Sequence, residues 1–271
     1  MVQLWAMSPL RPWTVILFLF VGPLLHAQER PAAVTEEIQA VAGALRTQPP
    51  EVALRRMDSL LTLPPAAQHP LLRMGLHYYR GHALRLLGRQ DEALEAHTRA
   101  YALADSLDDH KGRIDARIAI SLIHMDLGQL DKAHRELLDI HARTQARPTE
   151  RNYRIGLLLG HLCELQGRRD SALHWFTLAQ GPAEAAHDST ALCEILFNKG
   201  LIHRDLHDAV RSEEHLLAAL AHLPRAGYPQ LEGRVHQTLA SLYLQERRFA
   251  EVPPRLDRAY RIAQEHRAGD E

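Results

Sequence analysis

Residues 78–104 read YYRGHALRLLGRQDEALEAHTRAYALA, and their spacing of small residues recurs about every 40 residues through the rest of the chain. A small residue stands at Gly81, Ser121, Gly160, Gly200 and Ala240, followed seven positions later by Gly88, Gly128, Gly167, His207 and Arg247. Five further on lie Ala93, Ala133, Ala172, Ser212 and Val252, and seven beyond these lie Ala100, Ile140, Ala179, Ala219 and Ala259. Four columns in one register predict an array of repeated units, each of which contacts its neighbours.

Each unit reads as two helices. In residues 71–87, apolar side chains recur near the helical period of 3.6 at Leu72, Leu76, Tyr79, Ala83 and Leu87. Gly88 is expected to end this helix, because glycine enters the left-handed conformation with little strain. Asp91 suits the positive end of a second helix. A helix pair this small cannot bury its apolar stripe alone, so we predict an all-α fold of stacked hairpins; the alternative is an unrelated helical bundle.

A small residue, then glycine after seven positions, alanine after five and alanine after seven more, resembles the tetratricopeptide repeat (TPR), with LGR-DEA at 87–93 its most typical fragment. The resemblance covers five units from Leu71 to about Ala268. It implies a right-handed α-solenoid over residues 71–271, and residues 28–70 resemble a sixth, degraded unit in which Ala53 and Leu60 fall in register. TPR proteins use such arrays to bind other proteins. The long units of about 40 residues resemble those of exported bacterial TPR proteins.

The chain departs from the TPR pattern at three places. Its spacing of about 40 residues exceeds the usual 34 of the family. The turn glycine is replaced by His207 and by Arg247. Pro253 and Pro254 stand early in the last helix, where a first turn tolerates proline, so this helix is expected to begin near Val252.

The N-terminus has the layout of a secretory signal peptide over residues 1–27. Arg11 precedes an apolar run at 14–25, broken by Gly22 and Pro23, and Ala27 is a small residue before a cleavage site. Because about 20 apolar residues are needed to span a bilayer, the run is too short for a membrane helix. We predict export to the periplasm or the medium with no stable span after cleavage; the alternative is an uncleaved membrane anchor.

Charge is balanced, with 32 Lys plus Arg against 33 Asp plus Glu. Nucleic-acid binding demands a basic face, so no nucleic-acid partner is expected. The two cysteines, Cys163 and Cys193, fall about ten positions out of step on roughly parallel helices, which separates them by ~15 Å along the axis. We therefore predict that both are buried and unpaired.

Histidine is frequent, at 18 residues. His203 and His207 lie one helical turn apart with Asp205 between them, a spacing that suits zinc, and the flanking Glu194 and Asp208 are the residues that would complete such a site. The HExxH pattern is absent, however, and His207 occupies a turn position. We expect no metal site. Sequences typical of activated nucleophiles or phosphate-binding loops are also missing, so no catalytic residue and no cofactor are predicted.

In TPR proteins the first helix of each hairpin lines the concave face. By register, the expected inward residues are Tyr78, His82, Arg85, Asp115, Ile118, Leu122, Met125, Arg154, Leu157, His161, Glu164, Phe197, Leu201, Arg204, Arg234, Gln237 and Ser241. Ten of them are the candidate ligand contacts: Tyr78, His82, Arg85, Arg154, Leu157, His161, Phe197, Arg204, Arg234 and Gln237. Aromatic and apolar residues flanked by arginine suit a bound peptide with acidic groups.

The main functional prediction is an exported, non-enzymatic scaffold that binds a protein or peptide on this face. The first alternative is a stand-alone or truncated sensory arm of a bacterial signalling regulator, since long-unit arrays of this kind resemble those that precede output modules. A weaker alternative is a metallohydrolase that uses His203 and His207. Nothing in the sequence indicates an oligomeric state.

Overall fold

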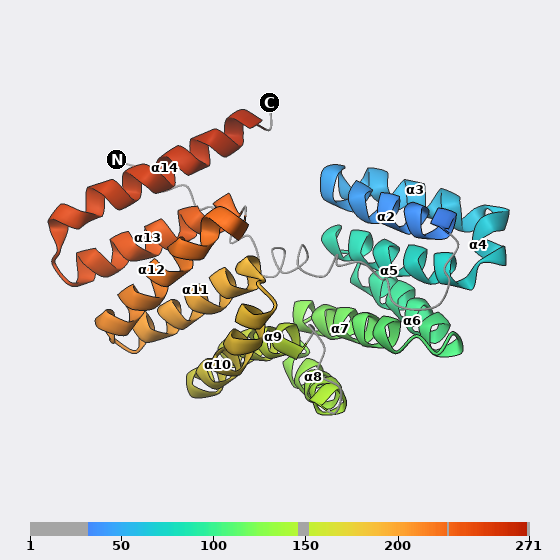
Figure 1. Cartoon of the computed structure of the whole chain (residues 1–271), viewed down its shortest axis with the longest axis horizontal. Coiled ribbons are helices and arrows are strands. Elements are labelled where there is room, and N and C mark those ends of the chain that lie inside the picture. The colour runs from blue at the N-terminus through green and yellow to red at the C-terminus, as the bar shows by residue number, and fades with distance from the viewer. Residues whose placement is uncertain (1–31, 146–151, 227, 270–271) are drawn as a thin grey trace. The chain divides into compact units, whose positions relative to one another are not determined.

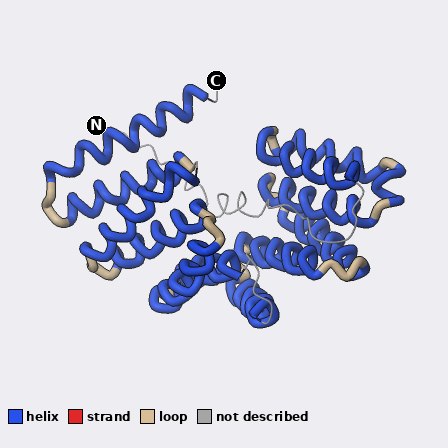
Figure 2. Tube along the Cα trace, viewed as in Figure 1, coloured by secondary structure: helices blue, strands red, loops and turns tan. Residues whose placement is uncertain are grey.

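The computed structural model describes residues 32–145, 152–226 and 228–269, and these ranges contain helices and short turns but no strand (Figures 1 and 2). The predicted all-α fold of stacked hairpins is confirmed. Residues 1–27 lie outside the described residues, so the signal peptide and its cleavage after Ala27 stay predictions. None of the helices in the described ranges is long and apolar enough to cross a membrane.

The chain divides into two compact units with a boundary between Ile140 and His141, inside α8. Unit 1 contains α2 (Ala32–Thr47), α3 (Pro50–Thr62), α4 (Pro64–Gln68), α5 (Pro70–Leu86), α6 (Gln90–Ser106), α7 (His110–Asp126) and most of α8 (Leu130–Gln145). The hairpin α5/α6 packs against α7 and against the hairpin α2/α3. The interpretation of residues 28–70 as a degraded repeat stays a prediction, but its hairpin shares the core of this unit.

Unit 2 contains α9 (Asn152–Leu165), α10 (Arg169–Ala185), α11 (Ser189–Asp205), α12 (Ala209–Ala226), α13 (Pro229–Gln245), the 3₁₀ turn η2 (Phe249–Glu251) and α14 (Val252–Gly269). Three hairpins form, α9/α10, α11/α12 and α13/α14, and α10 packs on α11 as α12 packs on α13. The first helices also touch in succession, α9 on α11 and α11 on α13. Residues spread along the sequence thereby meet on one face of the unit.

The turns inside the hairpins are left-handed at the predicted column, whether or not the residue is glycine. The φ angles are 74° at Gly88, 72° at Gly128, 71° at Gly167, 60° at His207 and 58° at Arg247. The amide of Arg89 donates to the carbonyl of Leu84 at 2.9 Å and so satisfies an end of α5, and the amide of Arg248 does the same for α13. His207 and Arg247 therefore take the glycine conformation at the steric cost of a side chain.

The first small-residue column marks close crossings within hairpins. A Cβ on Gly81 would lie 2.5 Å from Nε2 of His97, and one on Gly200 would lie 2.8 Å from Cγ of Leu216. At Gly160 the added atom would meet the ring of Phe176, with Cδ1 only 2.6 Å away. Real Cβ atoms essentially never approach so closely, so a side chain at any of these positions would force its neighbour to shift.

Two further expectations are confirmed in unit 2. The last helix begins at Val252, after the 3₁₀ turn, and Pro253 and Pro254 stand in its first turn. Cys163 and Cys193 are both buried and free.

Candidate functional site

In unit 1 the predicted inward residues are packing residues. The ring of His82 lies edge-on to Tyr78, with 4.5 Å between centroids, and to His97 of α6 at 4.8 Å. Arg85 places Nε 2.6 Å from Oδ2 of Asp126 at the end of α7, with both side chains almost fully buried. Helices α6 and α7 thus cover Tyr78, His82 and Arg85, which hold unit 1 together and present no open surface.

Three more candidates lie inside unit 2 or bind their own neighbours. Leu157 is fully buried. His161 is also buried, with its ring against Phe176 and its Nε2 3.5 Å from the amide nitrogen of Asn198. Arg204 is half-buried and pairs with the adjacent Asp205 at 3.0 Å. None of these three offers an exposed, unengaged group.

The remaining four candidates, Arg154, Phe197, Arg234 and Gln237, come from the three successive first helices of unit 2. They lie beside residues that were not predicted from the sequence to contact a peptide. We refer to Arg154, Asp188, Glu194, Phe197, Asn198, Tyr228 and Arg234 as the α9–α11–α13 face. Most of them belong to the N-terminal halves of these helices or to the residue that caps them.

One edge of the α9–α11–α13 face is formed by the ion pair between Arg154 and Asp188. Nη2 of Arg154 lies 3.2 Å from Oδ2 of Asp188, which also accepts a 2.7 Å hydrogen bond from the hydroxyl of Tyr153. The other oxygen of Asp188 accepts from the amide of Ala191 and caps α11. Burial opposes ionisation of Asp188, but these three donors together keep the pKa of its carboxyl below the usual value. Asp188 therefore neutralises Arg154.

Arg234 forms the opposite edge of the face. Its guanidinium carbon lies 4.7 Å above the ring centroid of Phe197, while the ring itself is buried. Among the described residues this guanidinium has no ion pair and no hydrogen bond, and the residue is exposed. Gln237, three positions later on α13, is exposed as well and is a neighbour on the helix surface. The stacking holds the cation in place without using its donors.

Between these edges lies Glu194, a buried carboxyl group without a partner. Only 5% of the residue is exposed, and neither carboxyl oxygen has a hydrogen-bond partner in the described structure. Burial raises the pKa of Glu194 to about 8, with Asp188 adding to the rise and Arg234 and Arg154 opposing it. The hydroxyl of Tyr228 is likewise buried without a partner, and burial followed by the charge of Glu194 raises its pKa.

Glu194 is not among the peptide contacts that the sequence predicts, because aromatic residues and arginine indicate a binding surface more strongly than a single glutamate does. The sequence does contain one indication of its role. Glu194 is the only charged residue in the apolar run ALCEILF at 191–197, and all seven residues of this run are buried in α11. Buried carboxyl groups that lack partners are rare in folded proteins and call for an explanation.

The arrangement around His203 does not resemble a metal centre. His203 lies 3.7 Å from Asp208 and packs against His215, whereas His207 is the left-handed residue of the turn. Glu194, which flanks these histidines in the sequence, belongs instead to the α9–α11–α13 face. Across the described residues no group of three or more His, Cys, Asp or Glu side chains is arranged to hold a metal ion.

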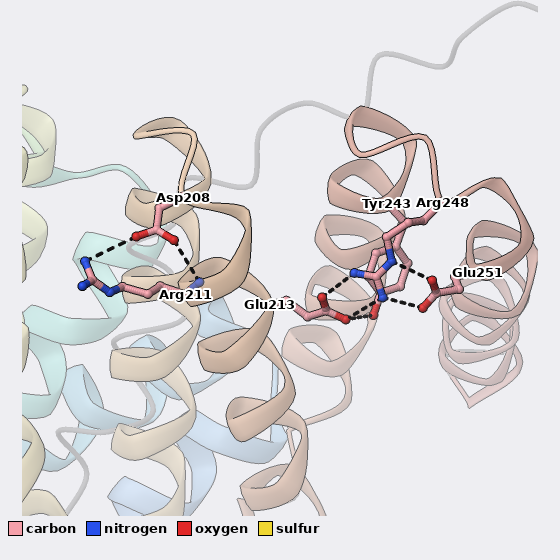
Figure 3. A network of polar contacts seen from close by, with 6 residues as sticks. All are labelled: Asp208, Arg211, Glu213, Tyr243, Arg248 and Glu251. Atoms are coloured by element: carbon pink, nitrogen blue, oxygen red, sulfur yellow. Dashed lines mark hydrogen bonds and ion pairs between the residues drawn. The ribbon is translucent and has the colours of Figure 1, made fainter.

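A separate polar network stabilises the end of unit 2 (Figure 3). Arg248 binds Glu213 of α12, with Nη2 3.0 Å from Oε1, and Glu251 of η2, with Nε 2.6 Å from Oε1. Tyr243 of α13 donates its hydroxyl to Glu213 at 2.8 Å and lies under the guanidinium of Arg248. All donors and acceptors here are paired within the network, which makes it structural.

Comparison with solved structures identifies the fold. BtubC from P. vanneervenii matches with a TM-score of 0.64 and 16% identity over 88% of this chain and 93% of that one. Cut9 in the APC/C hetero-tetramer Cut9-Hcn1 matches at 0.65 and 17%, over 92% of this chain but 43% of that one. A Rap protein complexed with competence and sporulation factor matches at 0.67 and 14%, over 88% and 67%.

These neighbours are TPR-like helical-repeat proteins, so the predicted TPR-type architecture is confirmed at the level of the fold. Identities of 14–17% carry no further conclusion about this chain. No protein-family model matches the sequence, and no curated protein matches it either.

Proposed function

We propose that this protein is a non-enzymatic interaction scaffold that binds a polypeptide segment at the α9–α11–α13 face of unit 2. The observation that carries the proposal is Arg234, an exposed guanidinium stacked on Phe197 with its donors unused by the described residues. A planar guanidinium fixed in this way is pre-organised to bind a carboxylate or a main-chain carbonyl of a ligand. Arginine and aromatic residues also contribute most of the energy at protein interfaces.

The fold supports the same proposal. Stacked hairpins bring side chains from α9, α11 and α13 onto one continuous surface, which suits an extended ligand. Two of the similar structures contain a bound partner: the Rap protein is complexed with competence and sporulation factor, and Cut9 is assembled with Hcn1.

We also propose that the mature protein is exported and begins at Gln28. The support is the short apolar run at 14–25 and the small residue Ala27 before the expected cleavage site. N-terminal sequencing of the protein from the envelope fraction should find Gln28 first. Finding Met1 on membrane-bound protein would favour the uncleaved anchor instead.

The binding proposal is tested by charge reversal at matched positions. Arg234→Glu changes the α9–α11–α13 face, whereas Arg211→Glu changes an exposed arginine of α12 that pairs with Asp208 (Figure 3). Affinity capture from the native envelope fraction, at increasing salt, should recover partners with wild type and Arg211→Glu and lose them with Arg234→Glu. Salt should weaken the wild-type capture, since exposed charge pairs are screened. Equal capture by all three proteins would place the binding surface elsewhere.

A further inference from the structure

Glu194 needs donors that the described part of the chain does not supply. A carboxyl group has one O–H donor and several acceptor positions when protonated and about four acceptor positions when ionised, and here both oxygens are buried and have no partner. Burying a polar group without a hydrogen-bond partner costs free energy of folding. Glu194 therefore does not stabilise the free protein. Tyr228, with its own buried and unpartnered hydroxyl, lies close enough for the charge of Glu194 to act on it.

The charges that surround Glu194 leave room for one more cation. Arg154 from α9 is neutralised by Asp188 at the start of α11. Arg234 from α13 is exposed and stacked on Phe197, so its charge reaches Glu194 from a solvated position. Helices α10 and α12 also pack against α11, but among the described residues their acidic groups act on Lys199 and not on Glu194.

We propose that Glu194 is the subsite of this face for a positively charged nitrogen of the bound polypeptide, either a lysine or arginine side chain or the chain's N-terminus. An ammonium or guanidinium group brings several donors to the two carboxyl oxygens, and its charge stabilises the ionised carboxylate, which a neutral donor such as an amide does much less. Arg234 stays stacked on Phe197 beside this subsite and binds another group of the same ligand. This inference rests on the proposed function.

The subsite has a pH signature. Burial keeps Glu194 protonated in the free protein up to a pKa of about 8. A bound cation favours the ionised carboxylate, so binding releases a proton and strengthens as pH rises. Linkage between pH 6.5 and 8.5 then gives an increase in affinity of about 20-fold. A ligand carbonyl that accepted from the protonated group would show the opposite trend.

The test uses full-length protein on an array of random dodecapeptides with one fixed central residue, either lysine, arginine, norleucine or glutamate. One set is N-acetylated and one has a free N-terminus, which separates the two sources of the cation. At pH 8.5 wild type should prefer lysine or arginine over norleucine, or free over acetylated termini, by about tenfold. Glu194→Gln, which keeps the shape of the side chain, should lose this preference and the pH dependence while still binding peptides through Arg234.

The outcomes are distinct. Peptide binding without a preference for cations, or with the same preference in Glu194→Gln, overturns the subsite but leaves the proposed scaffold function. Absence of binding by wild type to every peptide contradicts the scaffold function itself. Should Glu194→Gln fail to fold by circular dichroism, the wild-type pH profile decides: affinity for lysine peptides that does not rise from pH 6.5 to 8.5 also overturns the subsite.

Discussion

Gly160 gives the sharpest test of the helix crossings that build unit 2. Substitution by alanine would place a Cβ against the buried ring of Phe176, 2.6 Å from Cδ1, so the ring or the helix α9 must shift. Overpacking of this kind costs about 1–3 kcal/mol. Replacing glycine by alanine inside a helix gains about 0.5–1 kcal/mol, so the net destabilisation of Gly160→Ala should lie between about 0 and 2.5 kcal/mol.

The matched control is Gly233→Ala in α13, where the new Cβ would meet only Cγ2 of Ile262 at an ordinary 3.7 Å. This variant should be stabilised by about 0.5–1 kcal/mol, because only the helical preference for alanine acts. Urea denaturation followed by circular dichroism and by the fluorescence of Trp175, the residue next to Phe176, measures both. If Gly160→Ala were as stable as Gly233→Ala, the close crossing and the repeat register on which it rests would be refuted.

Three further perturbations follow from the contacts. Burial lowers the pKa of His97 to about 3 and that of His82 well below its usual value, so the unfolded chain binds protons first and stability falls as pH drops below about 6.5, by ~1.4 kcal/mol per pH unit for each histidine. Thermal melts between pH 7.5 and 5 should show this loss and a smaller one in His97→Gln; identical slopes would contradict it. Asp126→Ala should cost about 3–5 kcal/mol by leaving Arg85 buried and unpaired, and Arg85→Met/Asp126→Leu should recover most of that loss in urea titrations. His207→Gly should stabilise unit 2 by about 1 kcal/mol, because φ is 60° there; a lower urea midpoint would show that the side chain of His207 contributes more than the strain costs.

Local signals made much of the fold predictable. The hairpin period, the left-handed turns at Gly88 and Gly128 and the start of the last helix at Val252 each depend on a few adjacent residues. Glycine at a turn, proline in a first turn and small residues at a crossing have the same physical meaning in any helical array. The left-handed turn at His207 was harder to predict, because its conformation is imposed by the packing of α11 on α12 and not by the residue itself.

The site was less predictable because it depends on which side chains other hairpins supply. Tyr78 and Arg85 have the composition of a ligand surface, yet α6 and α7 cover them in unit 1. The stacking of Arg234 on Phe197 joins residues 37 positions apart, and the isolation of Glu194 follows from the pairing of Arg154 with Asp188. Such relations are set by packing between neighbouring hairpins and have no counterpart in the spacing of one sequence segment.

Site-specific photocrosslinking tests the central claim most directly. A photoreactive residue in place of Gln237, which is exposed beside Arg234 on α13, should crosslink to the partner captured from the envelope fraction. The same residue in place of Thr177, exposed on α10, should not. Mass spectrometry of the adducts should map position 237 to one polypeptide segment of the partner. Crosslinks formed from position 177 and not from position 237 would contradict binding at the α9–α11–α13 face.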